Sequence, residues 1–483
     1  MKPSRFLSFL SVFLLLVMVA GCGKTEVGGV INPPPPGSSA VSITMTDTPP
    51  AGVTVISFEV TLTGATLNPG NVSLVSNPIQ IEVKRLETEA AFLTAVNVPA
   101  GTYNSITLTL ANPELTFKND TGATINLPGL SCPNGAVCEF KPTVSGSVTY
   151  SGPPFPVTIL ANTPTGFLVD VNLNNILTST GGIGVDFNAA GGLVVFQLPL
   201  PGSPTGELHE IEDVLGIVAN KDAANNQFTL QTRRINLTVK VDNMTVFEGF
   251  SEGTPPCAAN NFTCVQNGQV VEVDLKLMAS LAAGTLLAKK VELEDNVADD
   301  ELDGVIVSVD NATQFKMVLI EQLRNVAGIE IGNLLTVTLA TGATFRVDDN
   351  GLTIPSGLKG AFEGATDTSQ LLVGQTVQVR RGASSSGAAI NTDRVRLRGT
   401  RFTAKVFGAP VPPNFNVNNL PALFTSAGIT QIQVQTQAAT EFEGGITGVS
   451  GLADGNTVSL RGLLFKSTPN PVLIAKKVRK RTP

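Results

Sequence analysis

The sequence predicts an all-β protein with four folded domains, and three observations carry that prediction. The 483 residues include 47 glycines and 31 prolines, whereas only 15% of them are charged. This composition is typical of short strands joined by turns. Apolar and polar residues alternate in many segments, as they do in strands with one buried face. A sequence unit of roughly 80 to 100 residues then recurs in the C-terminal half, which indicates tandem copies of one small domain.

The first 21 residues resemble a secretory leader. Lys2 and Arg5 precede an apolar run over residues 6–20, which is the layout of a secretory signal. The run is shorter than the roughly 20 residues of a membrane-spanning helix. It ends in VAGC at residues 19–22, which resembles the lipobox of bacterial lipoproteins. The resemblance implies cleavage before Cys22 and lipid on its thiol, so we expect a membrane anchor. An ordinary signal with a chance cysteine is the alternative.

Residues 22–40 are predicted to form a tether behind that lipid. Gly23 stands where the lipoprotein pattern has an aspartate for retention in the inner membrane. We therefore expect the outer membrane, with the chain facing the periplasm or the cell surface. The stretch GGVINPPPPGSS is rich in Pro, Gly and Ser. Such a segment stays extended and holds a folded part away from the bilayer.

Residues 41–199 are predicted to form the first domain. Alternating segments begin at Val41 (VSITM), Val55 (VISFEVTL) and Phe167 (FLVDVNL), and AGTYNSITLTL lies between the last two. Together these pieces resemble a bacterial domain of unknown function (DUF4382-like) that recurs near the start of envelope lipoproteins. The resemblance implies a β-sandwich, similar to transthyretin, and brings no established activity.

The rest of the chain is predicted to contain three repeats. One linker precedes the first repeat, and an acidic linker separates the first repeat from the second. The predicted ranges are 200–212 (linker), 213–295 (repeat 1), 296–301 (acidic linker), 302–399 (repeat 2) and 400–483 (repeat 3). Each repeat holds a Phe-Glu-Gly tripeptide, beginning at Phe247, Phe362 and Phe442. Their last strands are also alike, reading LAKKVELED, INTDRVRLRG and LIAKKVRKR. A long excursion from Asn325 to Gly360 is expected to interrupt the second repeat.

These repeats resemble a second domain of unknown function (DUF5666-like) that is often found in tandem in bacterial surface proteins. The resemblance implies small barrels of about five or six strands, similar to OB-folds.

Four cysteines besides Cys22 form two close pairs, Cys132 with Cys138 and Cys257 with Cys264. Each pair brackets a loop rich in Pro, Gly or Asn, which predicts a local disulfide in an oxidising compartment. One zinc site with four cysteine ligands is the alternative, although its ligand spacings exceed the usual two to four residues. We expect no metal and no cofactor.

Charge in the barrels suggests one candidate binding surface. Arg394, Arg396 and Arg398 alternate with apolar residues, so they are expected on the outer face of one strand. Six arginines form the candidate anion-binding set: Arg380, Arg381, Arg394, Arg396, Arg398 and Arg401. Such a face would suit an anionic envelope glycan, whereas protection of an edge strand is the alternative. The acidic run over residues 292–303 reads as a solvated linker, with a calcium site as the alternative.

Several functions are disfavoured. The net charge of −7 argues against nucleic-acid binding. His209 is the single histidine, and Asp213 occupies the second histidine position of a zinc-protease pattern, so neither that site nor a Ser-His-Asp triad can be assembled. We therefore expect a non-enzymatic, membrane-anchored envelope lipoprotein that acts as a structural or binding module. Glycan binding and a carboxylate-based hydrolase are the alternatives.

Overall fold

A computed structural model describes most of the chain beyond the predicted tether. The described residues are 37–48, 54–75, 77–88, 91–178, 184–198, 210–233, 235–251, 256–276, 285–295, 300–349 and 351–481. Cys22 and His209 lie outside these ranges. Among the described residues, no helix has the length and apolar character needed to span a bilayer.

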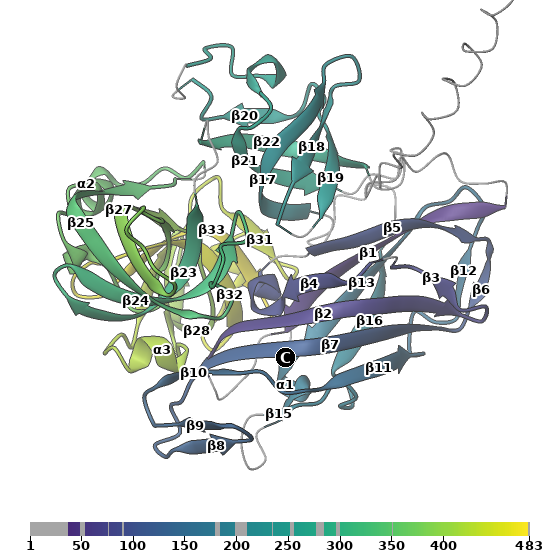
Figure 1. Ribbon diagram of the computed structural model, residues 1–483, viewed down its shortest axis with the longest axis horizontal. Coiled ribbons are helices and arrows are strands. Elements are labelled where there is room, and N and C mark those ends of the chain that lie inside the picture. Colours follow the sequence, from purple (N-terminus) through teal and green to yellow (C-terminus); the bar gives the residue numbers. More distant parts are fainter. Residues whose placement is uncertain are drawn as a thin grey trace, which may run out of the picture. The chain divides into compact units, whose positions relative to one another are not determined.

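The first domain is a sandwich of two sheets (Figure 1). The smaller sheet has the order β16-β13-β1-β5, with β1 (Ser38–Thr48), β5 (Ala91–Pro99), β13 (Thr165–Asn172) and β16 (Leu193–Leu198). The larger sheet is built on the long pair β2 (Thr54–Asn68) and β7 (Ser105–Lys118). Its shorter strands are β3 (Val72–Ser73), β4 (Ile79–Glu82), β10 (Val137–Phe140) and β11 (Ser145–Tyr150).

Short elements complete this domain at its ends. They are η1 (Val83–Glu87), β6 (Gly101–Tyr103), β8 (Ile125–Leu127), β9 (Leu130–Cys132), β12 (Val157–Ile159), α1 (Leu173–Ile176), β14 (Leu177–Thr178) and β15 (Gly184–Val185).

Both sheets contribute to one core, which confirms the predicted β-sandwich. Phe58 and Phe117 come from the larger sheet and Phe167 from the smaller one, and all three are fully buried. Alternation along the strands explains this, because every second side chain of a strand points to the same face. The strands β1 and β13 pair in parallel. The likeness to transthyretin stays a prediction.

The three predicted repeats fold as three five-stranded barrels. Barrel 1 is β17 (Glu210–Asp222), β18 (Gln227–Gln231), β19 (Asn236–Lys240), β21 (Val270–Lys276) and β22 (Thr285–Asp295). Barrel 2 is β23 (Glu301–Asn311), β24 (Gln314–Gln322), β25 (Leu334–Val347), β26 (Thr376–Arg380) and β27 (Ala389–Arg398). Barrel 3 is β28 (Thr400–Val411), β29 (Asn414–Asn418), β30 (Ile432–Gln435), β32 (Thr457–Phe465) and β33 (Val472–Lys480).

All three barrels close in the same way. The first strand pairs with the second and the fourth, and the third strand pairs in parallel with the fifth, as β19 does with β22, β25 with β27 and β30 with β33. The strand order is therefore 1-2-3-5-4-1 in each barrel. This arrangement agrees with the predicted OB-like fold, a small Greek-key barrel of five strands.

Smaller elements connect the barrel strands. They are β20 (Val246–Glu248), η2 (Phe262–Cys264), α2 (Ser356–Glu363), η3 (Thr368–Gln370), α3 (Ala422–Thr425), β31 (Glu441–Glu443) and η4 (Val449–Gly451). The prediction that residues 325–360 interrupt the second repeat was wrong, because this segment contains β25, the third strand of barrel 2. The long loop expected there is thus part of the barrel itself.

The Phe-Glu-Gly tripeptide takes two conformations. In barrels 1 and 3 it forms β20 and β31, and each strand is followed by a glycine with positive φ, Gly249 at 75° and Gly444 at 78°. In barrel 2 the same tripeptide ends the helix α2, and Gly364 has a negative φ of −82°. The repeat therefore tolerates strand or helix between its third and fourth barrel strands.

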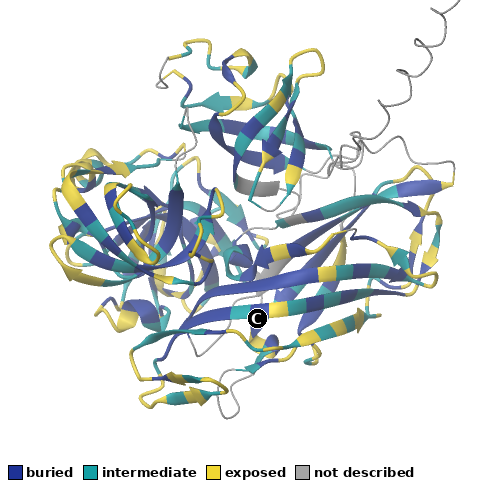
Figure 2. Cartoon of the chain, in the orientation of Figure 1, coloured by how far each residue is buried: buried dark blue, intermediate teal, exposed yellow. Residues whose placement is uncertain are grey.

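Barrels 2 and 3 share part of one core. Four apolar side chains of the β32–β33 hairpin pack into the core cluster of barrel 2: Leu463, Phe465, Val472 and Ile474. Figure 2 shows buried positions on the barrel strands that alternate with intermediate and exposed ones. The core of barrel 1 is a separate cluster centred on residues such as Phe228 and Val273.

A buried arginine–carboxylate cluster as the candidate functional site

The last strands of barrels 1 and 2 carry opposite charges at equivalent positions. The aligned segments are VELED from Val291 and VRLRG from Val395, so Glu292 corresponds to Arg396, and Glu294 to Arg398. The strand registers agree, because Glu292 pairs with Glu272 and Arg396 pairs with Gln378, each on the fourth strand of its barrel. One repeat therefore presents carboxylates where the next presents guanidinium groups.

Arg398 lies at the centre of the contact between these strands. It forms ion pairs with Glu272 of β21 and with Asp348, which follows β25. Two longer pairs, each 3.5 Å, join it to Glu294 of β22 and Asp303 of β23. Arg396 also pairs with Glu294. We call these six residues the Arg398 cluster.

The cluster is shielded from solvent. The side chains of Glu272 and Glu294 are 0% and 2% exposed, and that of Arg398 is 9% exposed. Buried charges are stable only when paired, and the fork of donors on a guanidinium group suits several carboxylates at once. The buried carboxylates of the cluster thus depend on the two arginines.

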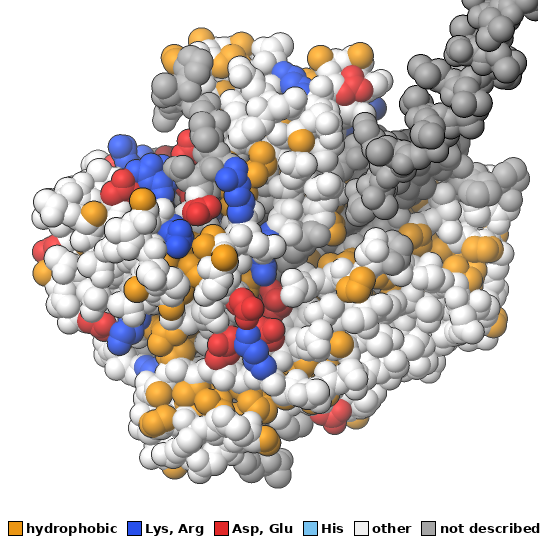
Figure 3. All heavy atoms as spheres, viewed as in Figure 1, with side chains coloured by type: hydrophobic (Ala, Val, Ile, Leu, Met, Phe, Trp, Pro, Cys, Tyr) orange, Lys and Arg blue, Asp and Glu red, His pale blue; other side chains and the backbone are white. Residues whose placement is uncertain are grey.

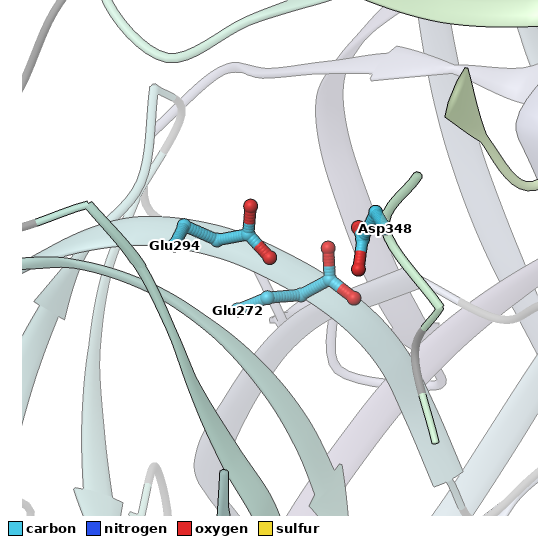
Figure 4. Close-up of side chains that lie close together, drawn as sticks. All are labelled: Glu272, Glu294 and Asp348. Atoms are coloured by element: carbon cyan, nitrogen blue, oxygen red, sulfur yellow. The ribbon is translucent and has the colours of Figure 1, made fainter. Parts of the chain in front are cut away.

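Three of its carboxylates meet the distance requirement of a metal site. Glu272, Glu294 and Asp348 each place one oxygen within 4.8 Å of the others, and Figure 4 shows the three groups pointing toward one another. However, Arg398 pairs with all three. We therefore assign them as partners of the guanidinium group, which supplies the positive charge that a metal ion would supply.

Burial perturbs the carboxylates unequally. Burial raises the pKa of Asp303 to about 7, against the opposing charge of Arg398, and raises the pKa of Glu292 to about 7. It also raises the pKa of Glu294 well above its usual range. At Glu272, burial acts in the same direction, but the charges of Arg398 and Lys290 outweigh it and lower the pKa. The cluster therefore combines a permanently charged pair with acids that hold protons near neutral pH.

A small pocket adjoins the cluster. Asp303, Asp348 and Arg398 line it together with residues of η1 and barrels 2 and 3: Arg85, Ile320, Glu321, Leu352, Thr376, Gly399, Arg401, Arg461, Gly462, Leu463 and Lys476. Its cavity volume is about 30 Å³. At about 10 to 15 Å³ for each water, that space holds two or three water molecules and not a sugar ring. A raised carboxyl pKa beside a pocket often marks a functional site, but this pocket is too small for a glycan substrate.

The six arginines predicted to bind anions do not form one open surface. Arg394, Arg396 and Arg398 do share one face of β27, as predicted, yet that face is covered and each side chain pairs with carboxylates. The expectation of an exposed basic strand was wrong for these three, because the sequence pattern did not show that β22 presents its glutamates to them. An anionic glycan would have to displace those carboxylates.

The other three arginines also have protein partners. Arg380 donates through Nε to Asp393 at 2.9 Å. Arg381 pairs with Asp300 at 3.9 Å and donates to the Ser385 carbonyl. Arg401 donates to the Gly399 carbonyl at 3.3 Å. Figure 3 shows basic and acidic side chains interspersed on the face drawn there, which is the distribution expected of local ion pairs.

The acidic run is not a solvated linker throughout. The side chains of Glu294, Glu301 and Asp303 are buried at its two ends. Arg394 pairs with both Asp295 and Glu301. That expectation was wrong for the described part of the run, because these three carboxylates have basic partners elsewhere in the chain. Residues 296–299 of the run lie outside the described ranges.

Both predicted disulfides are formed. Cys132 bonds to Cys138 and Cys257 to Cys264, with Cα atoms 6.0 and 5.7 Å apart. Cys132 and Cys264 are fully buried, so each bridge fastens its loop to the body of its domain. The zinc alternative is excluded for these four residues, since a disulfide sulfur has no thiolate to offer a metal.

Sequence reasoning missed two members of the Arg398 cluster. Glu272 sits in the strand VVEVDLK, where its alternation looks ordinary, and Asp348 follows β25 in a segment that looked like an insertion. The available signal was the charge inversion between VELED and VRLRG. Opposite charges at equivalent positions of a tandem repeat indicate that neighbouring copies face each other.

Comparisons with known proteins agree with the domain organisation. Residues 38–185 match the family model of a domain of unknown function (DUF4382). Residues 216–292 match a second domain of unknown function (DUF5666). The first match covers most of the sandwich and the second covers most of barrel 1, so both predicted kinds of domain are present. No curated protein and no solved structure matches this chain.

Proposed function

We propose that this protein is a bacterial envelope lipoprotein, held to the outer membrane by lipid on Cys22, whose β domains act as a non-enzymatic structural or binding module. The lipobox-like VAGC at residues 19–22 carries the proposal. The two disulfides support it, because such bonds persist in oxidising compartments outside the cytoplasm. The partner would be another envelope protein or an envelope polymer.

The anchor is tested by labelling cells with a clickable fatty acid and extracting the protein into detergent. The wild-type protein is expected to carry the label and to enter the detergent phase, whereas Cys22→Ser should do neither. Cys257→Ser serves as a control for the loss of a cysteine and should keep the label. Label retained on Cys22→Ser would overturn the proposal.

The non-enzymatic assignment rests on how the carboxylates are used. In the described residues, the strongly perturbed acids Glu294 and Asp303 are paired with arginines, and Asp303 lines a cavity of about 30 Å³. Turnover of an envelope substrate by purified protein, lost on Asp303→Asn without loss of folding, would contradict this assignment and favour the carboxylate-based hydrolase.

A further inference from the structure

We propose that the contact between barrels 1 and 2 is a proton-linked joint, which closes on acidification and loosens as the pH rises. The joint consists of the Arg398 cluster with Lys290 and Glu292 of β22. Lys290 pairs with Glu292 at 2.6 Å, next to the cluster on the same strand. The inference concerns how two domains of the chain are held together, and it does not depend on the lipid anchor.

The joint contains more carboxylates than cations. Five carboxylates (Glu272, Glu292, Glu294, Asp303 and Asp348) face three cations (Lys290, Arg396 and Arg398) in the joint. Carboxylates in excess of their cations repel one another strongly in a buried site, and protonation relieves the repulsion. The closed joint therefore binds protons that the open, solvated side chains would release at neutral pH.

The groups around the joint do not supply the missing positive charge. Five further carboxylates lie on the packed elements, namely Glu248 (β20), Asp274 (β21), Asp295 (β22), Glu301 (β23) and Glu321 (β24). Five further cations lie there too, namely Arg85 (η1), Arg394 (β27), Arg401 (β28), Arg461 (β32) and Lys476 (β33). The excess of carboxylates thus remains when every neighbouring element is included.

The carboxylates of the joint differ in whether they stay charged or can take up protons. Glu272 keeps its charge, because Arg398 and Lys290 hold its pKa below the usual range. Glu292 and Asp303, with pKa values raised by burial to about 7, can take up protons while Glu272 remains paired with Arg398. Protonation thereby removes repulsion without removing the central ion pair.

The joint is tested with spin labels on the full chain in detergent. Labels at Ala223→Cys and Thr341→Cys, both exposed positions on barrels 1 and 2, report the distance between the barrels by pulsed electron paramagnetic resonance. One narrow distance is expected near pH 6 and a broader, longer distribution near pH 8. The ratio of closed to open molecules should change by up to about tenfold per pH unit for each proton bound.

Two variants and a matched control decide the source of the response. Glu294→Gln and Glu292→Gln each remove one surplus charge, so the joint should stay closed near pH 8. Glu330→Gln removes a carboxylate that is 66% exposed and pairs with Lys141 outside the joint, and it should keep the wild-type response. If one variant fails to fold, the other still tests the proposal.

Three results would overturn the proposal. The first is a wild-type distance distribution that does not change between the two pH values. The second is a wild-type pH response in both glutamine variants. The third is closure near pH 8 by calcium ions alone, which would make the joint a cation site.

Discussion

Glu294 and Arg398 occupy the same position in successive repeats, and their side chains form an ion pair at 3.5 Å between barrels 1 and 2. Barrel 3 has Arg481 at this position. A basic last strand opposite another basic last strand would be repelled. Opposite charge at this repeat position therefore helps to hold the last strand of barrel 1 against the last strand of barrel 2. Barrels 2 and 3 meet instead through the apolar side chains of the β32–β33 hairpin.

Replacing Arg398 by methionine should be strongly destabilising. The change leaves Glu272, Glu294 and Asp348 buried without their shared partner, and an uncompensated buried charge costs about 3 to 5 kcal/mol. Urea denaturation of the purified protein measures the loss. Arg380→Met is the control, because the pair with Asp393 is solvent-exposed and such pairs contribute less than about 1 kcal/mol. Similar losses in both variants would refute the special role of Arg398.

Exchanging the charges should recover part of the stability. Glu294→Arg alone places a third guanidinium group next to Arg396 and Arg398, so it should destabilise the protein by several kcal/mol. The double variant Glu294→Arg with Arg398→Glu restores opposite charges at these two positions. A double-mutant cycle should give a favourable coupling of about 1 to 3 kcal/mol. A coupling near zero would show that the two residues do not interact.

Gly444 and Gly445 provide a matched pair for testing the end of β31. Both have positive φ, 78° and 76°. A Cβ on Gly444 would lie 1.9 Å from the Lys480 carbonyl oxygen, whereas a Cβ on Gly445 would have nothing within 4 Å. Gly445→Ala should cost about 1 kcal/mol for backbone strain alone, and Gly444→Ala about 3 kcal/mol or more because β33 must shift. Thermal unfolding that ranks the two in the reverse order would contradict this geometry.

The Cys257–Cys264 bridge should stabilise barrel 1 by about 2.5 kcal/mol, since it closes a short loop in the unfolded chain over a sequence separation of 7 residues. The double variant Cys257→Ala with Cys264→Ala should lower the free energy of unfolding by that amount, and the denaturation midpoint should fall with it. Reduction with dithiothreitol should then have a smaller further effect on the variant than on the wild type. An unchanged midpoint would mean that the loop is held by packing alone.

Stability should fall as the pH rises toward neutrality, in part through Asp303. Its folded pKa of about 7 lies above the usual aspartate pKa of 3.8, so between those values the folded state holds a proton that the unfolded state has lost. The favourable term is complete at low pH and disappears as the pH passes the folded pKa. Asp303→Asn should flatten this slope in urea denaturation from about pH 5 to about pH 8.

Asp367→Asn is the control for that experiment. The side chain of Asp367 accepts a hydrogen bond from Ser369, which lowers its pKa, so it titrates below this window. The slope should therefore remain as in the wild type. An equal change in both variants would show that the effect is not specific to Asp303.

The sequence allowed the fold class and the domains to be predicted because both depend on local patterns. Alternation identified strands such as β2 and β13, and the recurring last strands of the repeats identified the barrels. Segment 325–360 was misinterpreted because a strand that crosses a barrel carries no signal that separates it from an insertion. Its partner β27 lies far away in sequence.

The candidate site was harder to predict because it depends on distances between separate strands. The face shared by Arg394, Arg396 and Arg398 followed from alternation alone. That Glu272 and Asp348 meet Arg398 follows only from the packing of barrel 1 on barrel 2. A pattern along one strand shows which side chains share a face, but it does not show what covers that face.

The β32–β33 hairpin of barrel 3 packs into the core of barrel 2, which limits where the chain can be truncated. Because Leu463, Phe465, Val472 and Ile474 fill the interior of the preceding barrel, a chain truncated after residue 399 would expose the apolar wall that they cover. Such a fragment should aggregate rather than behave as a shorter version of the protein. During synthesis, barrel 2 would therefore remain incomplete until the last strands of the chain are available.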